Sequence, residues 1–162
     1  MHVRGQLRDA VVTILAADTG LAALGVGGRV WSHRLRPVDP AMLPCLLVYV
    51  VREQVDAVSG PRPLRLRRLV DLLVVVRDKG PTGGDGYSGD VPGDGVELRV
   101  DALAAAVEAT LGDFALAAVA KDFQLVGVEI AADPSADPTV LEAQMLYRAV
   151  IETRDGSPEI VA

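Results

Sequence analysis

The sequence predicts an α+β fold, a mainly antiparallel sheet of about four strands with two helices packed on one face. Two amphipathic helical patterns, an apolar hairpin at about residues 46 to 78 and two late strand patterns point to it. Their order along the chain is α-β-β-β-α-β-β. Because strands and helices do not alternate, a doubly wound nucleotide-binding sheet is not expected.

Length and composition indicate a single domain and argue against a membrane-spanning protein. The chain has 162 residues, half of them hydrophobic, which is enough for a single α+β domain over residues 1 to 155. A glycine and a proline predict a loose tail over residues 156 to 162. The longest apolar runs, Leu43 to Val51 and Leu69 to Val76, are shorter than the roughly 20 residues that cross a bilayer. No membrane partner is therefore expected.

Charge and aromatic content argue against nucleic-acid recognition. The formal net charge is −6, so the field of the whole protein repels nucleic acid. Aromatic residues make up 4% of the chain, too few for a platform on which bases stack. The N-terminus carries Arg4, Arg8 and Asp9 and so lacks the apolar stretch of a secretory signal. We expect the protein to stay in the cell that makes it.

The first helix is predicted over residues 3 to 17, with an end near Asp18-Thr19-Gly20, where a glycine can close a helix. Arg29 to Ser32 then has an extended pattern, and three prolines keep residues 33 to 44 from regular structure. The helix is predicted because its apolar residues recur at helical spacing: Val3, Leu7, Val11, Ile14 and Leu15.

The hairpin consists of two apolar runs around a turn. Its first arm, residues 45 to 55, is rich in β-branched side chains, and Ser59-Gly60-Pro61 predicts the turn. In the second arm, alternation gives one wholly apolar face and one mixed face. The apolar face holds Leu66, Val70, Leu72, Val74 and Val76, and the mixed face holds Arg67, Leu69, Asp71, Leu73, Val75 and Arg77.

The second half of the chain begins with a flexible loop. Residues 79 to 95 contain seven glycines, two prolines and three aspartates, a composition that does not bury enough apolar surface to become ordered. The ligand spacing of an EF-hand calcium site is missing there. A second helix over residues 96 to 111 follows, and Gln124 to Ala132 and Val140 to Thr153 are predicted strands.

Residues of the types used in catalysis or metal binding do not form a recognisable site. His2 and His33 have no carboxylate or second histidine at helical spacing, and Cys45 lies in an apolar stretch, where a thiol usually acts as a small hydrophobic residue. No phosphate-binding glycine motif is present. We therefore predict no enzyme, no metal and no cofactor.

The arginines beside the hairpin turn are the main charge cluster. Three interpretations remain open for Arg62, Arg65, Arg67 and Arg68: a solvated strand end, a surface that meets acidic residues of a partner or neighbouring subunit, or a nucleic-acid contact. Alternation places Arg65 and Arg67 on the same face of the strand. A predicted interface with a partner or a neighbouring subunit comprises Arg62, Arg65, Arg67, Arg68, Asp71 and Arg77.

Residues 4 to 153 resemble a known family in the order and spacing of their segments. A helix, RGQLRDAVVTILA, is followed by RVWSHRLRPVDPAMLPCLLVYV, by the strand RRLVDLLVVV, by the helix VELRVDALAAAVEATL and by LVGVEIAADPSADPTVLEAQMLYRAVIETR. This pattern is similar to the tail terminator proteins of long-tailed phages, the lambda-type minor tail protein U family, with relatives in prophages and gene transfer agents. The glycine-rich loop is longer than the family usually shows.

The resemblance implies a structural protein of virion assembly. Such a protein caps the finished tail tube as a ring, commonly a hexamer, stops tube growth and forms the surface for head-tail joining. Its implied partners are other copies of itself, the major tail tube protein and a head-completion or connector protein. Its implied location is the head-proximal end of the virion tail, after assembly in the host cytoplasm. The alternative is a small α+β ligand-binding or enzymatic domain of unknown substrate.

Overall fold

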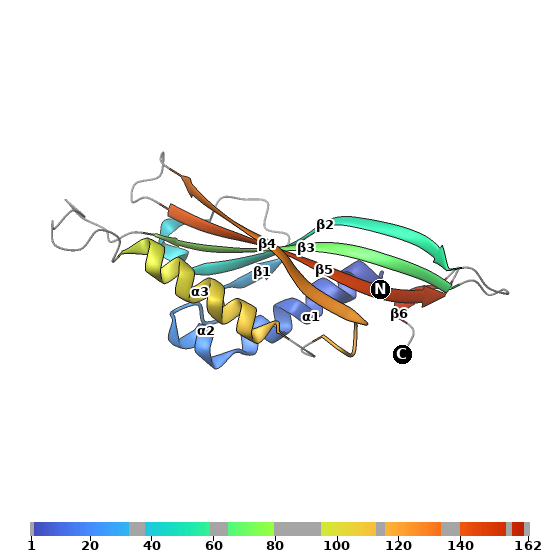
Figure 1. Ribbon diagram of the computed structural model, residues 1–162. Coiled ribbons are helices and arrows are strands. Elements are labelled where there is room, and N and C mark those ends of the chain that lie inside the picture. The colour runs from blue at the N-terminus through green and yellow to red at the C-terminus, as the bar shows by residue number, and fades with distance from the viewer. Residues whose placement is uncertain are drawn as a thin grey trace.

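The structure is a computed structural model, and it describes residues 2–32, 38–58, 65–79, 95–112, 116–133, 140–154 and 157–160. Along the chain the elements are α1 (Val3–Ala17), α2 (Thr19–Ala23), β1 (Val30–Ser32), the short 3-10 helix η1 (Pro40–Met42), β2 (Cys45–Val58), β3 (Arg65–Lys79), α3 (Val96–Thr110), β4 (Asp122–Asp133), β5 (Val140–Arg154) and β6 (Ser157–Ile160). The helices and the sheet form two layers (Figure 1).

Six strands form one sheet in the described part of the chain. Five follow the order β1-β2-β3-β5-β4, and the short β6 pairs with β5. Only the β1–β2 pair is parallel. The pairing of β2 with β3, from Cys45 opposite Arg77 to Val58 opposite Arg65, confirms the predicted hairpin. The α+β prediction is confirmed, with more strands than the four expected.

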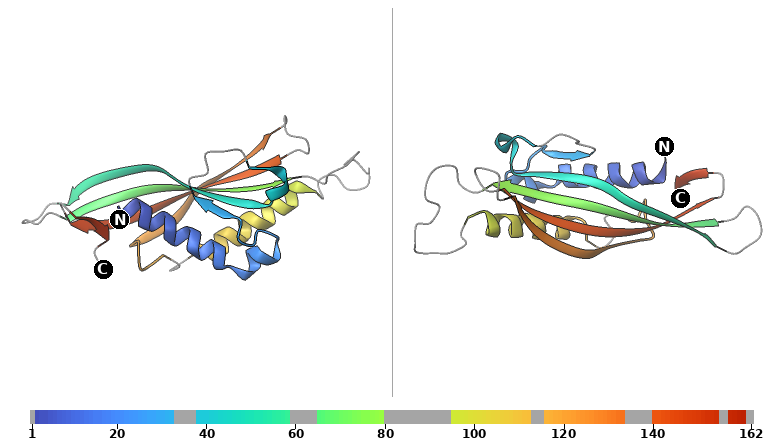
Figure 2. Two further views of the ribbon diagram at one scale, coloured as in Figure 1. Left: turned by 180° about the vertical axis from the view of Figure 1, so that it is seen from behind. Right: turned by 90° about the horizontal axis from the view of Figure 1, so that it is seen from above.

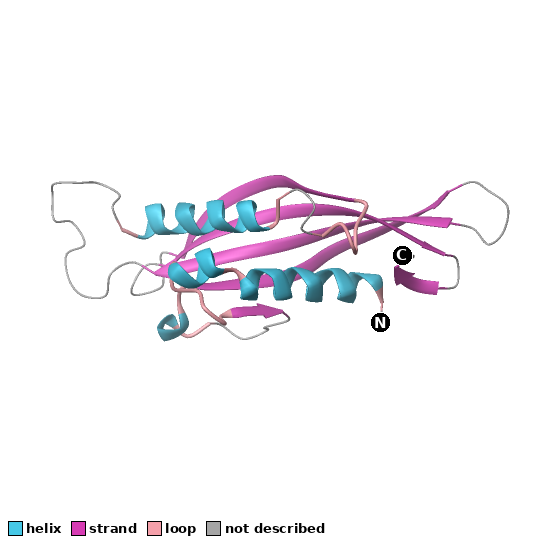
Figure 3. Ribbon diagram, turned by 90° about the horizontal axis from the view of Figure 1, so that it is seen from below, coloured by secondary structure: helices cyan, strands magenta, loops and turns pink. Residues whose placement is uncertain are grey.

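Both long helices cover the same face of the sheet, as predicted (Figure 3). α1 packs on β1 and β2, whereas α3 packs on β3 and β5. Apolar side chains recur every three or four residues on each helix and are buried against the sheet. Full burial of one of them stabilises the fold by about 1.5 to 3 kcal/mol. They are Val3, Leu7, Val11 and Leu15 on α1, and Val100, Leu103, Val107 and Leu111 on α3.

The helix-covered face of the sheet provides the other half of the core. Alternate residues of the central strands point into it, as the strand patterns predicted. On β3 these are Val70, Leu72, Val74 and Val76, and on β5 they are Ala143, Met145, Tyr147, Ala149 and Ile151, all buried. The rings of Phe123 and Tyr147 stack with their centroids 5.0 Å apart.

α1 ends where the sequence predicted, but Gly20 does not close it. α1 ends at Ala17, and Gly20 lies inside the short helix α2. The backbone turns at Asp18, which is extended there, and the side chain of Asp18 accepts a hydrogen bond from Leu21 N at 2.7 Å. The break between the two helices is therefore made by Asp18, which caps the start of α2, and not by a glycine at the end of α1.

Two segments were predicted to be loose or flexible. The tail predicted over residues 156 to 162 contains β6, which adds backbone pairing beyond the end of β4 on β5, so it is not wholly loose. Of the loop predicted over residues 79 to 95, residues 80 to 94 lie outside the described residues.

The long β2–β3 hairpin extends past α1 at the end of the molecule where β6 lies (Figure 2).

Candidate interaction surface

One face of the sheet carries no long helix, and it is here called the open face (Figures 1 and 2). At one end it holds a small second core, in which Leu43 and Trp31 pack with Cys45 and Val140. Cys45 is fully buried there, as predicted. The rest of the open face carries the alternate residues of β3 that were predicted as its mixed face.

Two predicted interface residues form ion pairs across β3 and β5 on the open face. Arg148 donates from Nε to Asp71 Oδ1 at 2.7 Å and from Nη2 to Asp71 Oδ2 at 3.1 Å. These hydrogen bonds and the charge of Asp71 raise the pKa of Arg148. Arg77 Nη2 lies 2.6 Å from Glu142 Oε1. Asp71 and Arg77 thus have partners within the sheet, where they support its register.

Arg68 also has its partners within the chain, but on the helix-covered side. It is 8% exposed, Nε donates to the hydroxyl of Thr153 at 2.8 Å, and Nη1 bonds Glu53. Its neighbours Arg65 and Arg67 are exposed on the open face. Arg62, the fourth member of the predicted cluster, lies outside the described residues. The cluster is therefore divided between the two faces of the sheet.

The open face has a basic end, defined here as Arg65, Arg67 and Arg154. Arg65 stands directly opposite Arg154 in the pairing of β3 with β5, and Arg67 stands opposite Glu152. Like charges directly opposite each other on one face of a sheet destabilise it. An anionic group from another molecule would relieve that repulsion, which makes this end the best candidate for a contact surface.

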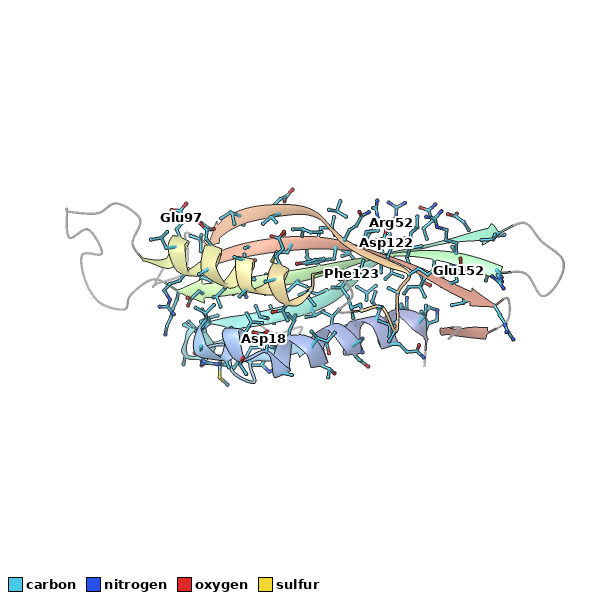
Figure 4. All side chains as sticks on the ribbon, turned by 60° about the horizontal axis from the view of Figure 1, so that its bottom comes forward. Asp18, Arg52, Glu97, Asp122, Phe123 and Glu152 are labelled. Carbon is cyan, nitrogen blue, oxygen red and sulfur yellow. The ribbon has the colours of Figure 1, made fainter. Side chains whose placement is uncertain are left out.

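Glu152, which Figure 4 labels, is the carboxylate of β5 beside the basic end, and it already has a partner. Lys121 Nζ lies 2.6 Å from Glu152 Oε1. This hydrogen bond lowers the pKa of Glu152, and the charges of Lys121, Arg65 and Arg67 lower it further. Asp56 of β2, which stands opposite Arg67, is a second carboxylate at this end. Because these two carboxylates lie beside four cations, Arg65, Arg67, Arg154 and Lys121, positive charge remains for a partner.

Sequence reasoning missed Arg154, Thr153 and Glu53. Each stands near the predicted arginines only because β3 pairs with β5 and β2 in one particular register. Alternation did contain one signal: Arg68 shares the parity of Leu66 and Val70, so it belongs to the apolar face and not to the face of Arg65.

Other kinds of site find no support in the described residues. No group of three or more His, Cys, Asp and Glu gathers there closely enough to hold a metal. The imidazole of His2 accepts from Arg4 N at the start of α1, and His33 lies outside the described residues. No described helix is long and apolar enough to span a membrane.

Comparison with known proteins gives a likeness in fold. No family model matches the chain, and no curated protein matches its sequence. Among solved structures, a chain in the virion of a native gene transfer agent particle is similar to it, with a TM-score of 0.50 and 21% identity. The match covers 91% of this chain and 95% of that chain, so the two share their fold along almost their whole lengths.

Proposed function

We propose that this chain is a non-enzymatic structural protein of a phage-like particle, and that it acts as a tail terminator. The observation that carries the proposal is the likeness to a virion chain of a gene transfer agent over 91% of the residues. The order of segments that resembles tail terminators supports the same choice. In this role a ring of copies, commonly six, caps the tail tube, stops its polymerisation and provides the head-joining surface.

The open face supplies a surface suited to this role. Its strands run the length of the molecule, and its basic end carries charge that the described residues do not fully neutralise. Such a patch meets acidic residues of a protein partner at low desolvation cost when it lies at the rim of an interface. The tail tube protein and a neighbouring subunit are the partners we propose, with a connector protein on the head side.

A length assay tests the proposal. The purified chain is added to polymerising subunits of the tail tube protein encoded with it, and tubes are measured by electron microscopy. We expect shorter tubes as the ratio of this chain to tube protein rises, and a ring at one end of each. An acidic protein of similar mass is the control. Tubes of unchanged length without end rings would rule out termination.

A further inference from the structure

One part of the helix-covered face has no helix over it in the described part of the chain. α3 packs on β3 and β5. Val128 of the outer strand β4 stands opposite the buried Met145, so it points to the helix-covered face, and Ile130 is two positions further on. The two side chains are 45% and 53% exposed. They form an apolar strip beside α3, of the kind that another molecule covers.

The flank of α3 that faces this strip is acidic. Glu97, Asp101 and Glu108 recur at steps of four and seven, so they lie on one side of the helix, and all three are exposed. Glu108 is close enough to Tyr147 to contribute to its raised pKa, and Tyr147 stacks on Phe123 of β4, so this side of α3 faces β4. Figure 4 labels Glu97 at the start of this flank.

The opposite flank of α3 has its partners within the chain. Arg99 Nε lies 3.0 Å from Oδ2 of the buried Asp78 at the end of β3, and Thr110 donates to Asp18. Arg99 is the only basic residue in the sequences of α3 and β4, so neither element supplies a free cation to the three carboxylates. The apolar strip and the acidic flank together are here called the α3–β4 surface, which comprises Glu97, Asp101, Glu108, Val128 and Ile130.

The hairpin end of the sheet carries a complementary set of side chains. Val58, Arg65 and Arg154 form the last described row across β2, β3 and β5, and they are here called the tip row. All three side chains are exposed. One apolar side chain and two positive charges thus lie next to one another, with no carboxylate directly opposite either arginine.

The carboxylates at this end do not neutralise the tip row. Asp56 and Glu152 both stand opposite Arg67, one row further in, and Glu152 also pairs with Lys121. Asp122 lies further in again, at the start of β4. Three carboxylates therefore lie near four cations, because the two arginines of the tip row add to Arg67 and Lys121. Positive charge remains, and it is concentrated in the tip row.

We propose that the tip row of one copy docks on the α3–β4 surface of the next copy, with Val58 on Val128 and Ile130 and the two arginines on the acidic flank. The proposal rests on the proposed function, in which copies form a ring. It names the contact between neighbouring copies of that ring.

The spacing of the charges favours this contact. Arg65 and Arg154 stand on neighbouring strands, which lie about 4.8 Å apart. Glu97 and Asp101 are four residues apart on α3, which is about 6 Å along the helix axis. Each arginine can therefore meet its own carboxylate. The contact also relieves the repulsion between the two arginines and that along the acidic flank.

The two surfaces lie toward opposite ends of the strands. Arg65 begins β3, whereas Asp78, which Arg99 of α3 contacts, lies at its end. A copy whose tip row has docked still offers its own α3–β4 surface, so the same contact repeats from copy to copy and can close as a ring. Tip-to-tip contacts would join like positive charges, and contacts between two α3–β4 surfaces would join like negative charges.

A chemical cross-link tests the contact. Val58→Cys and Ile130→Cys each add one thiol at an exposed position outside the core, and the buried Cys45 stays in place. The two variants are mixed at high concentration, with and without polymerised tail tubes, and treated with a short bismaleimide. We expect the mixed dimer and very little of either homodimer. A random mixture of the three dimers, or an excess of a homodimer, would overturn the proposal.

A chain that carries both new cysteines tests whether the contact repeats. We expect a ladder of cross-linked oligomers. Products that stop at a dimer would overturn the proposal, because two copies would then exchange their tips reciprocally. The parent chain, whose only cysteine is Cys45, is the control and should give no cross-linked product.

Charge reversal tests the same contact without cysteine. Arg65→Glu places a carboxylate in the tip row, and Asp101→Arg places a cation on the acidic flank. Each variant alone should form end rings on tubes about tenfold less often than the wild type, because like charges then meet. An equal mixture of the two should recover ring formation, since every contact between unlike copies pairs opposite charges.

The control for charge reversal is a variant of the exposed side of α1. Thr13→Arg with Ala16→Arg changes the net charge by the same two units as Asp101→Arg and should assemble like the wild type. Circular dichroism confirms that all variants remain folded. A mixture of Arg65→Glu and Asp101→Arg chains that assembles no better than either variant alone would contradict the proposal.

The outcomes also separate this proposal from the proposed function. End rings on tubes without the mixed cross-link overturn the tip contact and leave termination standing. The mixed cross-link and the ladder without any effect on tubes support the tip contact and refute termination. If neither the cross-link nor the rings form, both proposals are refuted.

Discussion

Arg68 and Thr153 are 85 positions apart in the sequence, yet Arg68 Nε donates to Thr153 Oγ1 at 2.8 Å. The same guanidinium bonds Glu53, and Glu53 Oε2 lies 3.9 Å from His2 Nε2 at the start of α1. These contacts join β2, β3, β5 and α1 at one end of the core. Because Arg68, Thr153 and Glu53 are nearly buried, each of these three depends on the others for its hydrogen bonds.

Removal of Arg68 should destabilise the fold strongly. Arg68→Ala leaves the Glu53 carboxylate without its ion partner at a site that is only 13% exposed, and we expect a loss of about 3 kcal/mol in the free energy of unfolding. Arg67→Ala, its exposed neighbour, should change it by less than about 0.5 kcal/mol. Urea denaturation measures both. Similar losses for the two variants would show that Arg68 is not a structural residue.

The alternation of side chains along β3 predicts the face of an arginine but not its partners. The period of two predicted both faces of β3 and the face of Arg65, Arg67 and Arg77, whereas Arg68 was assigned to the interface although its parity belongs to the apolar face. It did not predict which of them had partners, because Thr153, Glu53 and Arg154 approach only after the strands pair in register. Pairing between distant strands depends on the packing of the whole core, which no local pattern contains.

Local rules were reliable where one short segment decides the structure. The helices and the hairpin follow from spacing, and their ends agree with the prediction to within a few residues. At Asp18 the end of α1 was predicted in the right place, but the role given to Gly20 was wrong. Two local rules compete there, a glycine that ends a helix and an aspartate that begins one. The side chain of Asp18 also accepts from Thr110 Oγ1 of α3 at 3.0 Å, a tertiary contact that favours the second rule.

The free energy of unfolding should depend on pH through the carboxylate of Asp18. The hydrogen bond from Leu21 N is the main cause that lowers the pKa of Asp18 below its usual 3.8, and Thr110 adds to it. A lowered pKa in the folded state means that the ionised carboxylate stabilises the fold above pH 3.8 and that this contribution is lost as pH falls through the folded-state pKa. Asp18→Asn keeps the acceptor but not the charge.

The measurement compares the wild type with Asp18→Asn over a range of pH. At pH 7 we expect the wild type to be more stable by about 0.5 kcal/mol, the contribution of a negative charge at a helix start. The difference should shrink toward zero in strong acid. A difference that grows as pH falls would contradict the assigned role of the carboxylate.

Tyr147 should tolerate the loss of its hydroxyl. Its side chain is buried, and Oη has no hydrogen-bond partner among the described residues. Tyr147→Phe keeps the stacking on Phe123 and removes a buried polar atom, so we expect stability equal to the wild type or higher by up to about 1 kcal/mol. A loss above about 1 kcal/mol would show that the hydroxyl is bonded.

High pH gives a second measurement on the same variant. Burial, and to a smaller extent the charge of Glu108, raises the pKa of Tyr147 above its usual 10.0. The phenol therefore ionises more readily in the unfolded chain, and the wild type loses stability above pH 10. Tyr147→Phe lacks this loss, so its advantage should increase with pH. A constant difference between pH 8 and pH 11 would exclude the raised pKa.

The basic end should be needed for docking and not for folding. Arg65→Gln with Arg67→Gln removes two positive charges beside Arg154, which relieves the like-charge pair and leaves the core untouched. We expect unchanged or slightly higher stability and a tube-capping activity reduced at least tenfold. Arg4→Glu, on the exposed side of α1, changes the net charge by the same two units and serves as the control.

Salt should weaken capping by the wild type and have less effect on the double variant, because screening acts on the charges that the variant lacks. Capping by the double variant at the level of the control would assign Arg65 and Arg67 to a solvated strand end.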